Sequence, residues 1–264
     1  MTISKAFLPK VAANELTLPS PLSIGKGTPL AIRRLQEWLC LRKVQLKIDG
    51  EFGPATQGAC KTFAARLGQP YNGEVDQAFF DLLTAPMRNA VQPLSGNYAS
   101  LGSAIVAACK STLRFAVVEV GGDNRGPWVR LLMDGNDGPE WRWCAGYATK
   151  MVLMACEARK IGKEKLPFNI SFGCDEIAVS ARKAGKLLSG DHAASRKLVR
   201  PGDLFLVRKS DTDWIHVGVV EEPFADYFST SEGNTNDEGS PNGFEACRRQ
   251  RGWAGKDFVS LSHL

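Results

Sequence analysis

Residues 141–152 read WRWCAGYATKMV, in which Cys144 stands where a tryptophan-rich loop turns into a run of helical character. A thiol at a helix N-terminus meets the positive end of the helix dipole, which stabilises the thiolate and lowers the pKa of the cysteine. Cys144 is therefore a candidate nucleophile. The other interpretation is a structural cysteine, because free cysteines are among the most buried residue types. A nucleophilic thiol needs a base, and the three histidines limit the choice.

One of the three histidines has the setting of a catalytic base. His192 lies in a polar loop and His263 is the penultimate residue, whereas His216 lies within DWIHVGVV, residues 213–220. Alternation along this apolar segment predicts a strand that places His216 and Gly218 on one face, where the small glycine leaves space beside the imidazole. The alternative is a histidine with a purely structural role in a strand.

A third polar group follows in STSEGNTN, residues 229–236, where Glu232 and Asn234 are two positions apart. In an extended segment these two side chains share a face. Either one could accept the imidazole N–H and fix the tautomer of His216. Cys144, His216 and one of these two residues would supply the three parts that a thiol nucleophile requires.

The amino-terminal part has the pattern of a small helical domain. Residues 29–41 (PLAIRRLQEWLCL) predict an amphipathic helix, and further helices are expected from Pro54 and after Asp76. Each of the last two helices follows a turn containing Asn or Asp before Gly, so the unit contains a faint repeat of turn and helix. We therefore predict a three-helix domain over residues 1–86.

The remainder is predicted to be a linker and a second domain. Residues 87–103 are rich in Pro, Gly, Ser and Asn without periodicity, which is typical of a linker. In residues 104–264 helical segments come first, and short segments rich in β-branched and aromatic residues follow. This order predicts an α+β domain with helices packed on an antiparallel sheet.

The motifs of the second domain, taken in order, resemble a known family. WRWCAGYATKMV, a PGDLFLV strand, WIHVGVVE and SEGNTN are similar to the CHAP domain, the cysteine, histidine-dependent amidohydrolase/peptidase of bacterial wall hydrolases. The resemblance covers most of residues 104–240 and implies a papain-like fold. It also implies Cys144 as nucleophile, His216 as general base and then acid, Glu232 as the group that orients His216, and Asn234 as a supporting residue.

The amino-terminal part independently resembles a peptidoglycan-binding domain. The resemblance rests on Leu35-Gln36 in a helix and on DGEFG, residues 49–53, in the following turn. Together the two resemblances imply a modular, endolysin-like peptidoglycan hydrolase. They also suggest five residues for substrate contact: Trp143, Asn124, Trp214, Phe52 and Gln36.

No metal or other cofactor is expected. Some CHAP domains bind calcium through acidic residues just before and shortly after the nucleophile. Here Asp134, Asn136 and Asp137 precede Cys144, but Ala, Gly and Tyr follow it, so we interpret MDGNDGPE as a polar turn. The seven cysteines form an odd number without a CxxC pair, which argues against a disulfide framework and a zinc site.

The charge distribution suits an anionic polymer as partner. Residues 1–90 carry 11 Lys and Arg against 7 Asp and Glu, and Arg33 and Arg34 belong to a basic stretch in which Glu37 is the single acid. The bacterial wall, with its free stem-peptide carboxylates, is one such polymer. Nucleic acid is another, but the stretch has few interleaved aromatic residues and no recognised motif, so no nucleic-acid partner is expected. A solvated helix face is the alternative to any polymer.

The leading interpretation is a hydrolase that cleaves an amide of the stem peptide, as an N-acetylmuramoyl-L-alanine amidase or an endopeptidase. The first 30 residues contain no signal-peptide core and no apolar run is long enough to span a membrane. We therefore expect synthesis in the host or producer cytoplasm without a signal peptide. We further expect a monomer that acts on the cell wall in the periplasm, in phage lysis or as a secreted antibacterial effector.

Two alternatives belong to other function classes. One is a non-catalytic wall-binding protein on an inactivated cysteine-hydrolase fold, against which the presence of all three site residues counts. The other is an L,D-transpeptidase, but its motif is absent, and here the cysteine precedes the histidine.

Overall fold

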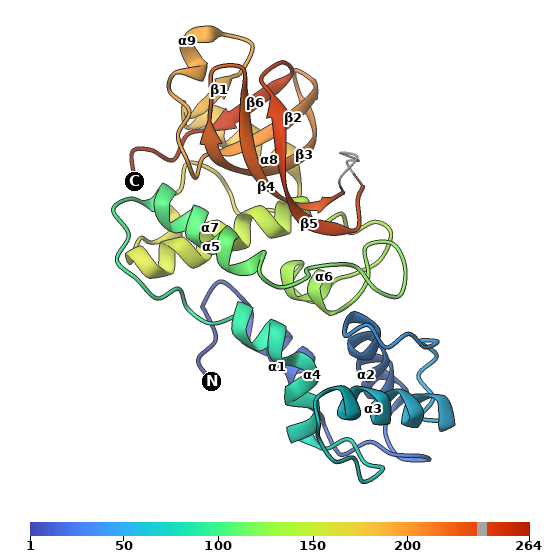
Figure 1. Cartoon of the computed structure of the whole chain (residues 1–264). Coiled ribbons are helices and arrows are strands. Elements are labelled where there is room, and N and C mark those ends of the chain that lie inside the picture. The colour runs from blue at the N-terminus through green and yellow to red at the C-terminus, as the bar shows by residue number, and fades with distance from the viewer. Residues whose placement is uncertain (237–241) are drawn as a thin grey trace.

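The structure is a computed structural model that describes residues 1–236 and 242–264. It has an α+β fold with one antiparallel sheet (Figure 1). The helices in the described residues are α1 (Pro9–Leu16), α2 (Pro29–Leu41), α3 (Pro54–Arg66), α4 (Gln77–Ala90), α5 (Leu101–Thr112), α6 (Pro127–Leu132), α7 (Cys144–Arg159), α8 (Cys174–Lys183) and α9 (Ala193–Arg196). The strands are β1 (Leu187–Ser189), β2 (Leu204–Ser210), β3 (Asp213–Pro223), β4 (Tyr227–Thr235), β5 (Glu245–Gly252) and β6 (Lys256–Val259).

The sheet places the two strands with the polar motifs side by side. Its order is β1-β6-β2-β3-β4-β5, and neighbouring strands run antiparallel. Helix α7 packs against β3 and β4, and α5 packs on α7, so the two helices lie beneath the sheet in Figure 1. The expected antiparallel sheet and its helical cover are therefore confirmed, and α7 begins directly at Cys144.

The helices α1 to α4 occupy the end of the molecule opposite the sheet (Figure 1). The helix predicted over residues 29–41 is confirmed as α2, Pro54 begins α3, and the Asp76 side chain caps α4 by accepting from the Phe79 N–H at 2.8 Å. Helix α1 was not predicted, because its short apolar pattern gives little periodicity. A unit of three helices is thus an incomplete description of this end of the chain.

The segment between the two parts is shorter than the predicted linker. Helix α4 continues through Pro86 to Ala90, and α5 begins at Leu101. Residues 91–100, rather than 87–103, therefore separate the two helices. Ser100 starts α5 with a capping box, in which its side chain accepts from the Ser103 N–H at 3.1 Å.

One continuous core joins the two parts. The buried apolar residues of α1 to α4 belong to the same cluster as those of α5 to α8, and Trp38 of α2 packs edge to face on Trp128 of α6. No helix within the described residues is long and apolar enough to cross a membrane.

Candidate active site

Helix α7 packs closely on the sheet because Gly233 on β4 has no side chain, since a Cβ there would lie 2.5 Å from Cβ of Tyr147. Gly146 allows a close approach of α7 to α6, since a Cβ there would lie 2.7 Å from the Leu132 carbonyl oxygen. Within the described residues no side chain caps the N-terminus of α7, so its first N–H groups are not taken by a cap. Cys144 is 3% exposed.

His216 and Glu232 form a buried pair across two neighbouring strands. His216 on β3 donates its Nε2–H to Oε2 of Glu232 on β4 at 2.8 Å, and both side chains are almost fully buried. Gly218 makes this pairing possible, since a Cβ there would lie 2.9 Å from Cγ of Glu232. The space predicted beside His216 exists and is occupied by Glu232.

Two further side chains hold Glu232 and were not found from the sequence. Arg251 on β5 donates to both carboxylate oxygens, at 2.8 Å from Nε and 2.6 Å from Nη2. Thr230 donates its hydroxyl to Oε1 at 2.6 Å. Burial alone would raise the pKa of Glu232, but the hydrogen bonds and charges of Arg251 and His216 outweigh it and lower the pKa to about 2. Glu232 is therefore a fixed anion behind the imidazole.

The remaining nitrogen of His216 is left for Cys144. Nδ1 is buried and makes no hydrogen bond to another described residue, while Nε2 is committed to Glu232. Burial acts to lower the pKa of His216, but its interactions with the Cys144 sulfur and with Glu232 prevail and raise it to about 9. The pair can therefore exist as thiolate and imidazolium, which is the activated form of a cysteine nucleophile.

Cys174 is a second thiol at the same place. It begins α8, and its sulfur lies 3.9 Å from that of Cys144. The thiol of Cys174 is the largest influence that lowers the pKa of Cys144 well below its ordinary value; burial opposes this effect, and His216 adds to it. The pKa of Cys174 itself is raised, first by Cys144, then by burial and by the charge of Asp175.

Asn234 has different partners from those expected. Its Nδ2 donates to Oδ1 of Asn124 at 3.1 Å, and none of its hydrogen bonds within the described residues reaches His216. The extended spacing that would align it with Glu232 is interrupted, because Asn234 has a φ of 53° and the β4–β5 register shifts between Glu232 and Thr235. Asn234 connects the strand to the loop before α6.

Three of the expected substrate-contact residues of the second domain lie in the interior. Trp143 donates its Nε1–H to Glu119 at 2.8 Å, Trp214 donates to Asp257 at 2.9 Å, and Asn124 donates to the Pro139 carbonyl at 3.1 Å. Their side chains are buried, so in this conformation they hold the loop and strand and offer little surface to a ligand.

The two expected contacts of the amino-terminal part are also buried. Gln36 accepts from the Gly50 N–H at 2.8 Å and donates to Asp49 at 2.8 Å and to Thr56 at 3.0 Å. Phe52, in the same turn, is 5% exposed. The Leu-Gln and Asp-Gly-x-Phe-Gly motifs thus have a physical explanation, because the glutamine fixes the turn that precedes α3.

Half-buried aromatic rings precede both cysteines. Trp141 and Phe172 lie three and two positions before Cys144 and Cys174, and their rings meet edge to face at 6.4 Å between centroids. Trp141 belongs to the motif around Cys144, but nothing in the sequence indicates that the ring of Phe172 packs against it. The pair offers apolar surface at the entrance to both helices.

The acidic turn before α7 is engaged in ion pairs. Asp134 accepts from Lys150 at 2.6 Å and Asp137 from Arg130 at 2.9 Å, while Asn136 donates to the Met133 carbonyl at 2.9 Å. No group of three or more His, Cys, Asp or Glu suited to a metal occurs in residues 1–236 and 242–264. Comparisons with protein-family models, curated proteins and solved structures found no match to this chain.

Gly218→Ala should lower turnover by displacing Glu232. The new methyl would lie 2.9 Å from Cγ of Glu232 and 2.6 Å from Cε1 of Phe205, so the strands or side chains have to shift. For a reaction carried out by Cys144 and His216, we expect kcat to fall at least about tenfold, and we expect stability to fall by about 1–3 kcal/mol. Gly252→Ala is the matched control, since nothing lies within 4 Å of its Cβ. Unchanged turnover in Gly218→Ala would contradict the proposed dependence on this spacing.

Proposed function

We propose that the chain is a cysteine-dependent peptidoglycan hydrolase that cleaves an amide of the stem peptide. The observation that carries the proposal is the constellation of Cys144, His216 and Glu232, in which a low-pKa thiol, an imidazole and a fixed carboxylate act on one another in sequence. The finer fold assignment, a papain-like CHAP domain behind a small wall-binding domain, belongs to the same proposal. It is supported by a nucleophile helix packed on an antiparallel sheet that carries the histidine and the carboxylate.

The proposed reaction begins from the thiolate of Cys144 and the imidazolium of His216. The Cys144 thiolate attacks the amide carbon, and the charge that develops on the oxygen is stabilised at the start of α7, where the Cys144 N–H is one donor. The imidazolium of His216 gives its proton to the leaving amine as the C–N bond breaks. Neutral His216 then takes a proton from water, which attacks the thioester and releases the acid, while the sulfur regains its resting state. Glu232 keeps the imidazole oriented throughout.

The choice of polymer rests on the amino-terminal part. A cysteine site alone fits many amides, whereas the resemblance around Gln36 and residues 49–53 and the basic bias of residues 1–90 favour the bacterial wall. We propose that the enzyme acts on peptidoglycan in phage lysis or as a secreted antibacterial effector. An amidase and an endopeptidase both fit the site, because both cleave an amide.

Zymography with purified sacculi tests the proposal. The wild-type protein should clear the gel and Cys144→Ala should not. Cys156→Ala should clear it like the wild type, since Cys156 lies on the same helix and burial raises the pKa of its thiol to about 11. Mass analysis of the released fragments identifies the bond. A wild-type protein that binds sacculi and releases nothing would instead support the non-catalytic wall-binding alternative.

A further inference from the structure

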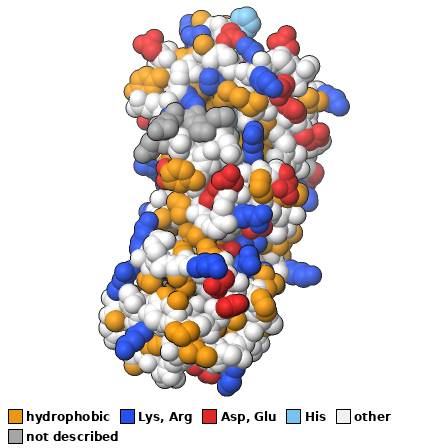
Figure 2. All heavy atoms as spheres, turned by 90° about the vertical axis from the view of Figure 1, so that its right-hand side faces the viewer, with side chains coloured by type: hydrophobic (Ala, Val, Ile, Leu, Met, Phe, Trp, Pro, Cys, Tyr) orange, Lys and Arg blue, Asp and Glu red, His pale blue; other side chains and the backbone are white. Residues whose placement is uncertain are grey.

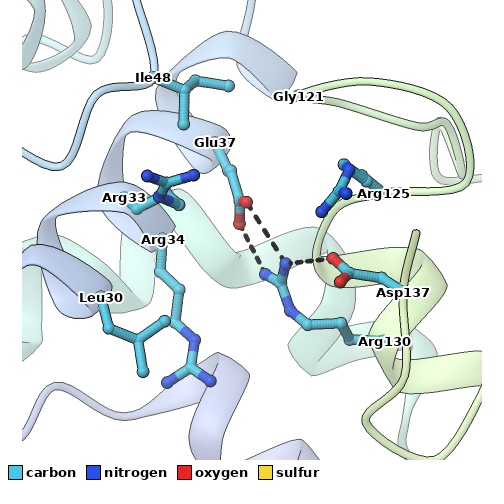
Figure 3. Close-up of a pocket in the computed structure, with 9 residues that line it drawn as sticks. All are labelled: Leu30, Arg33, Arg34, Glu37, Ile48, Gly121, Arg125, Arg130 and Asp137. Carbon is cyan, nitrogen blue, oxygen red and sulfur yellow. Dashed lines mark hydrogen bonds and ion pairs between the residues drawn. The ribbon is translucent and has the colours of Figure 1, made fainter. Parts of the chain in front are cut away.

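A pocket of about 390 Å³ lies at the junction between the helical end and the sheet-bearing part, apart from Cys144. This junction pocket is formed by Arg33, Arg34 and Glu37 of α2, by Arg125 of the loop before α6, by Arg130 of α6, and by Asp137 of the loop before α7 (Figure 3). Its volume is in the range of pockets that bind small ligands. Figure 2, which faces this side of the molecule, shows basic and acidic side chains mixed across the middle.

The floor of the junction pocket is a network of ion pairs centred on Arg130. Arg130 donates to Glu37 at 2.6 Å, to Asp137 at 2.9 Å and to Glu15 of α1 at 2.8 Å. These contacts tie α1 and α2 to the loop before α7, and they occupy the guanidinium on several sides. The carboxylates of the floor are thus already paired within the protein.

The walls contain arginines with donors to spare. Arg33 and Arg125 are exposed, and neither side chain has a hydrogen bond or ion pair with another residue in the described part of the chain. Figure 3 shows them on either side of the Glu37 carboxylate. The buried Nε of Arg34 lies 3.5 Å from Oε1 of Glu15 but makes no hydrogen bond to any described residue. Guanidinium groups of this kind are suited to a carboxylate or phosphate ligand.

The acids and the apolar walls favour one of these ligands. Glu37, Asp137 and Glu15 surround the arginines closely, so a multiply charged phosphate would be repelled more than a single carboxylate. Leu30, which is 59% exposed, and half-buried Ile48 complete the lining and suit small apolar side chains. The pocket therefore fits a short peptide with a free carboxylate.

The loop that carries Arg125 is bonded to the segment of the nucleophile. Glu119 accepts from the Asn124 N–H at 2.8 Å through one oxygen and from the Trp143 indole at 2.8 Å through the other. Asp137 is seven residues before Cys144, so the pocket lies within about 25 Å of the thiol along the chain. A polymer with repeated peptides can reach both places at once.

We propose that the junction pocket binds a free carboxylate of a stem peptide adjacent to the one that is cleaved, through Arg33 and Arg125. This inference rests on the proposed function, since it takes the peptidoglycan strand as the ligand. The pocket holds the strand in position while Cys144 acts on a neighbouring peptide. Binding at two points raises the effective concentration of the amide at the thiol.

Binding to intact sacculi tests the pocket. In the full chain carrying Cys144→Ala, Arg33→Gln together with Arg125→Gln should weaken sedimentation with sacculi at least about tenfold. Lys110→Gln with Arg114→Gln removes the same charge elsewhere and should weaken it less than twofold. The unfolding temperature of the Arg33 and Arg125 variant should match that of its parent, because both side chains are exposed and unpaired.

Blocked carboxylates identify the ligand. Sacculi whose carboxylates have been converted to amides should bind the parent at least about tenfold more weakly, and the pocket substitutions should then have no further effect. Equal binding by pocket and control variants overturns the inference, as does an undiminished effect of the pocket substitutions on amidated sacculi. Release of fragments by the wild-type protein is scored separately. If the wild-type protein releases no fragments but its binding still depends on Arg33 and Arg125, the hydrolase proposal is rejected and the proposal for the pocket is retained.

Discussion

Glu232→Ala is expected to lower kcat on sacculi by roughly a hundredfold to ten-thousandfold while leaving KM nearly unchanged. Glu232 is completely buried, accepts the Nε2–H of His216 at 2.8 Å and is held by Arg251. Without the carboxylate the imidazole loses the group that fixes its orientation and stabilises its charge. Asn234→Ala should cost less, because the hydrogen bonds of Asn234 within the described residues do not reach His216.

A matched control separates this effect from a general loss of ion pairing. Glu221 is also paired with an arginine of β5, Arg248 at 3.0 Å, but the imidazole of His216 is hydrogen-bonded to Glu232 and not to Glu221. Glu221→Ala should therefore retain turnover. Circular dichroism is needed beside the kinetics, since removing one partner of a buried ion pair can cost about 3–5 kcal/mol of stability. A larger loss in Asn234→Ala than in Glu232→Ala would assign the orienting role to the amide.

The pH profile gives a second readout of the same interaction. Because the pKa of His216 is raised to about 9, the imidazolium that protonates the leaving amine should be lost, and kcat/KM should fall, as the pH rises through about 9. In Glu232→Gln the neighbouring anion is gone, so this alkaline limb should move to lower pH. An unmoved limb would show that Glu232 does not support the charge of His216.

The same two groups set a pH window for stability. The folded pKa of His216, about 9, exceeds its ordinary 6.5, so its contribution is complete below about pH 6.5 and is lost as the pH rises through 9. The folded pKa of Glu232, about 2, lies below its ordinary 4.5, so its contribution is complete above about pH 4.5 and is lost as the pH falls through 2.

Local patterns in the sequence predicted the parts of the site that depend on one segment. The change from an aromatic loop to a helical run predicted a helix that starts at Cys144, and apolar alternation predicted a strand through His216. The small size of Gly218 predicted space beside the imidazole. The structure has all three features. The amphipathic helix over residues 29–41 was predictable for the same reason, because its apolar spacing alone indicates which face is buried.

Contacts between distant segments were not predictable in this way. Arg251 reaches Glu232 through the register of β4 and β5, and a bulge in that register also gives Asn234 a φ of 53°. Trp143 was predicted to contact substrate, but its indole is bonded to Glu119 in the interior. The pairing of Arg130 with α1 and α2 needed the relative placement of both parts of the chain.

Cys144 is expected to react before Cys174 with limiting iodoacetamide at about pH 6.5, although Cys174 is the more accessible thiol. Both begin a helix, so the dipole does not separate them. Their 3.9 Å contact does, because one proton shared between two adjacent sulfurs favours a single thiolate, and His216 places that charge on Cys144 while Asp175 disfavours it on Cys174.

The difference in thiolate fraction between Cys144 and Cys174 should affect their labelling rates more than the difference in their solvent exposure. Cys144 is 3% exposed and Cys174 is half-buried, which favours Cys174 by access alone. An ordinary thiol with a pKa near 8.5 is roughly 1% ionised at pH 6.5, and Cys174 is ionised less than that because its pKa is raised. The pKa of Cys144 is lowered well below its ordinary value by Cys174 and His216, so its thiolate fraction should exceed that of Cys174. Lysis should disappear in proportion to its labelling, and His216→Ala should slow that labelling by removing the positive partner. Peptide mapping that finds Cys174 labelled first, or labelled Cys144 with lysis intact, would remove Cys144 from the role of nucleophile.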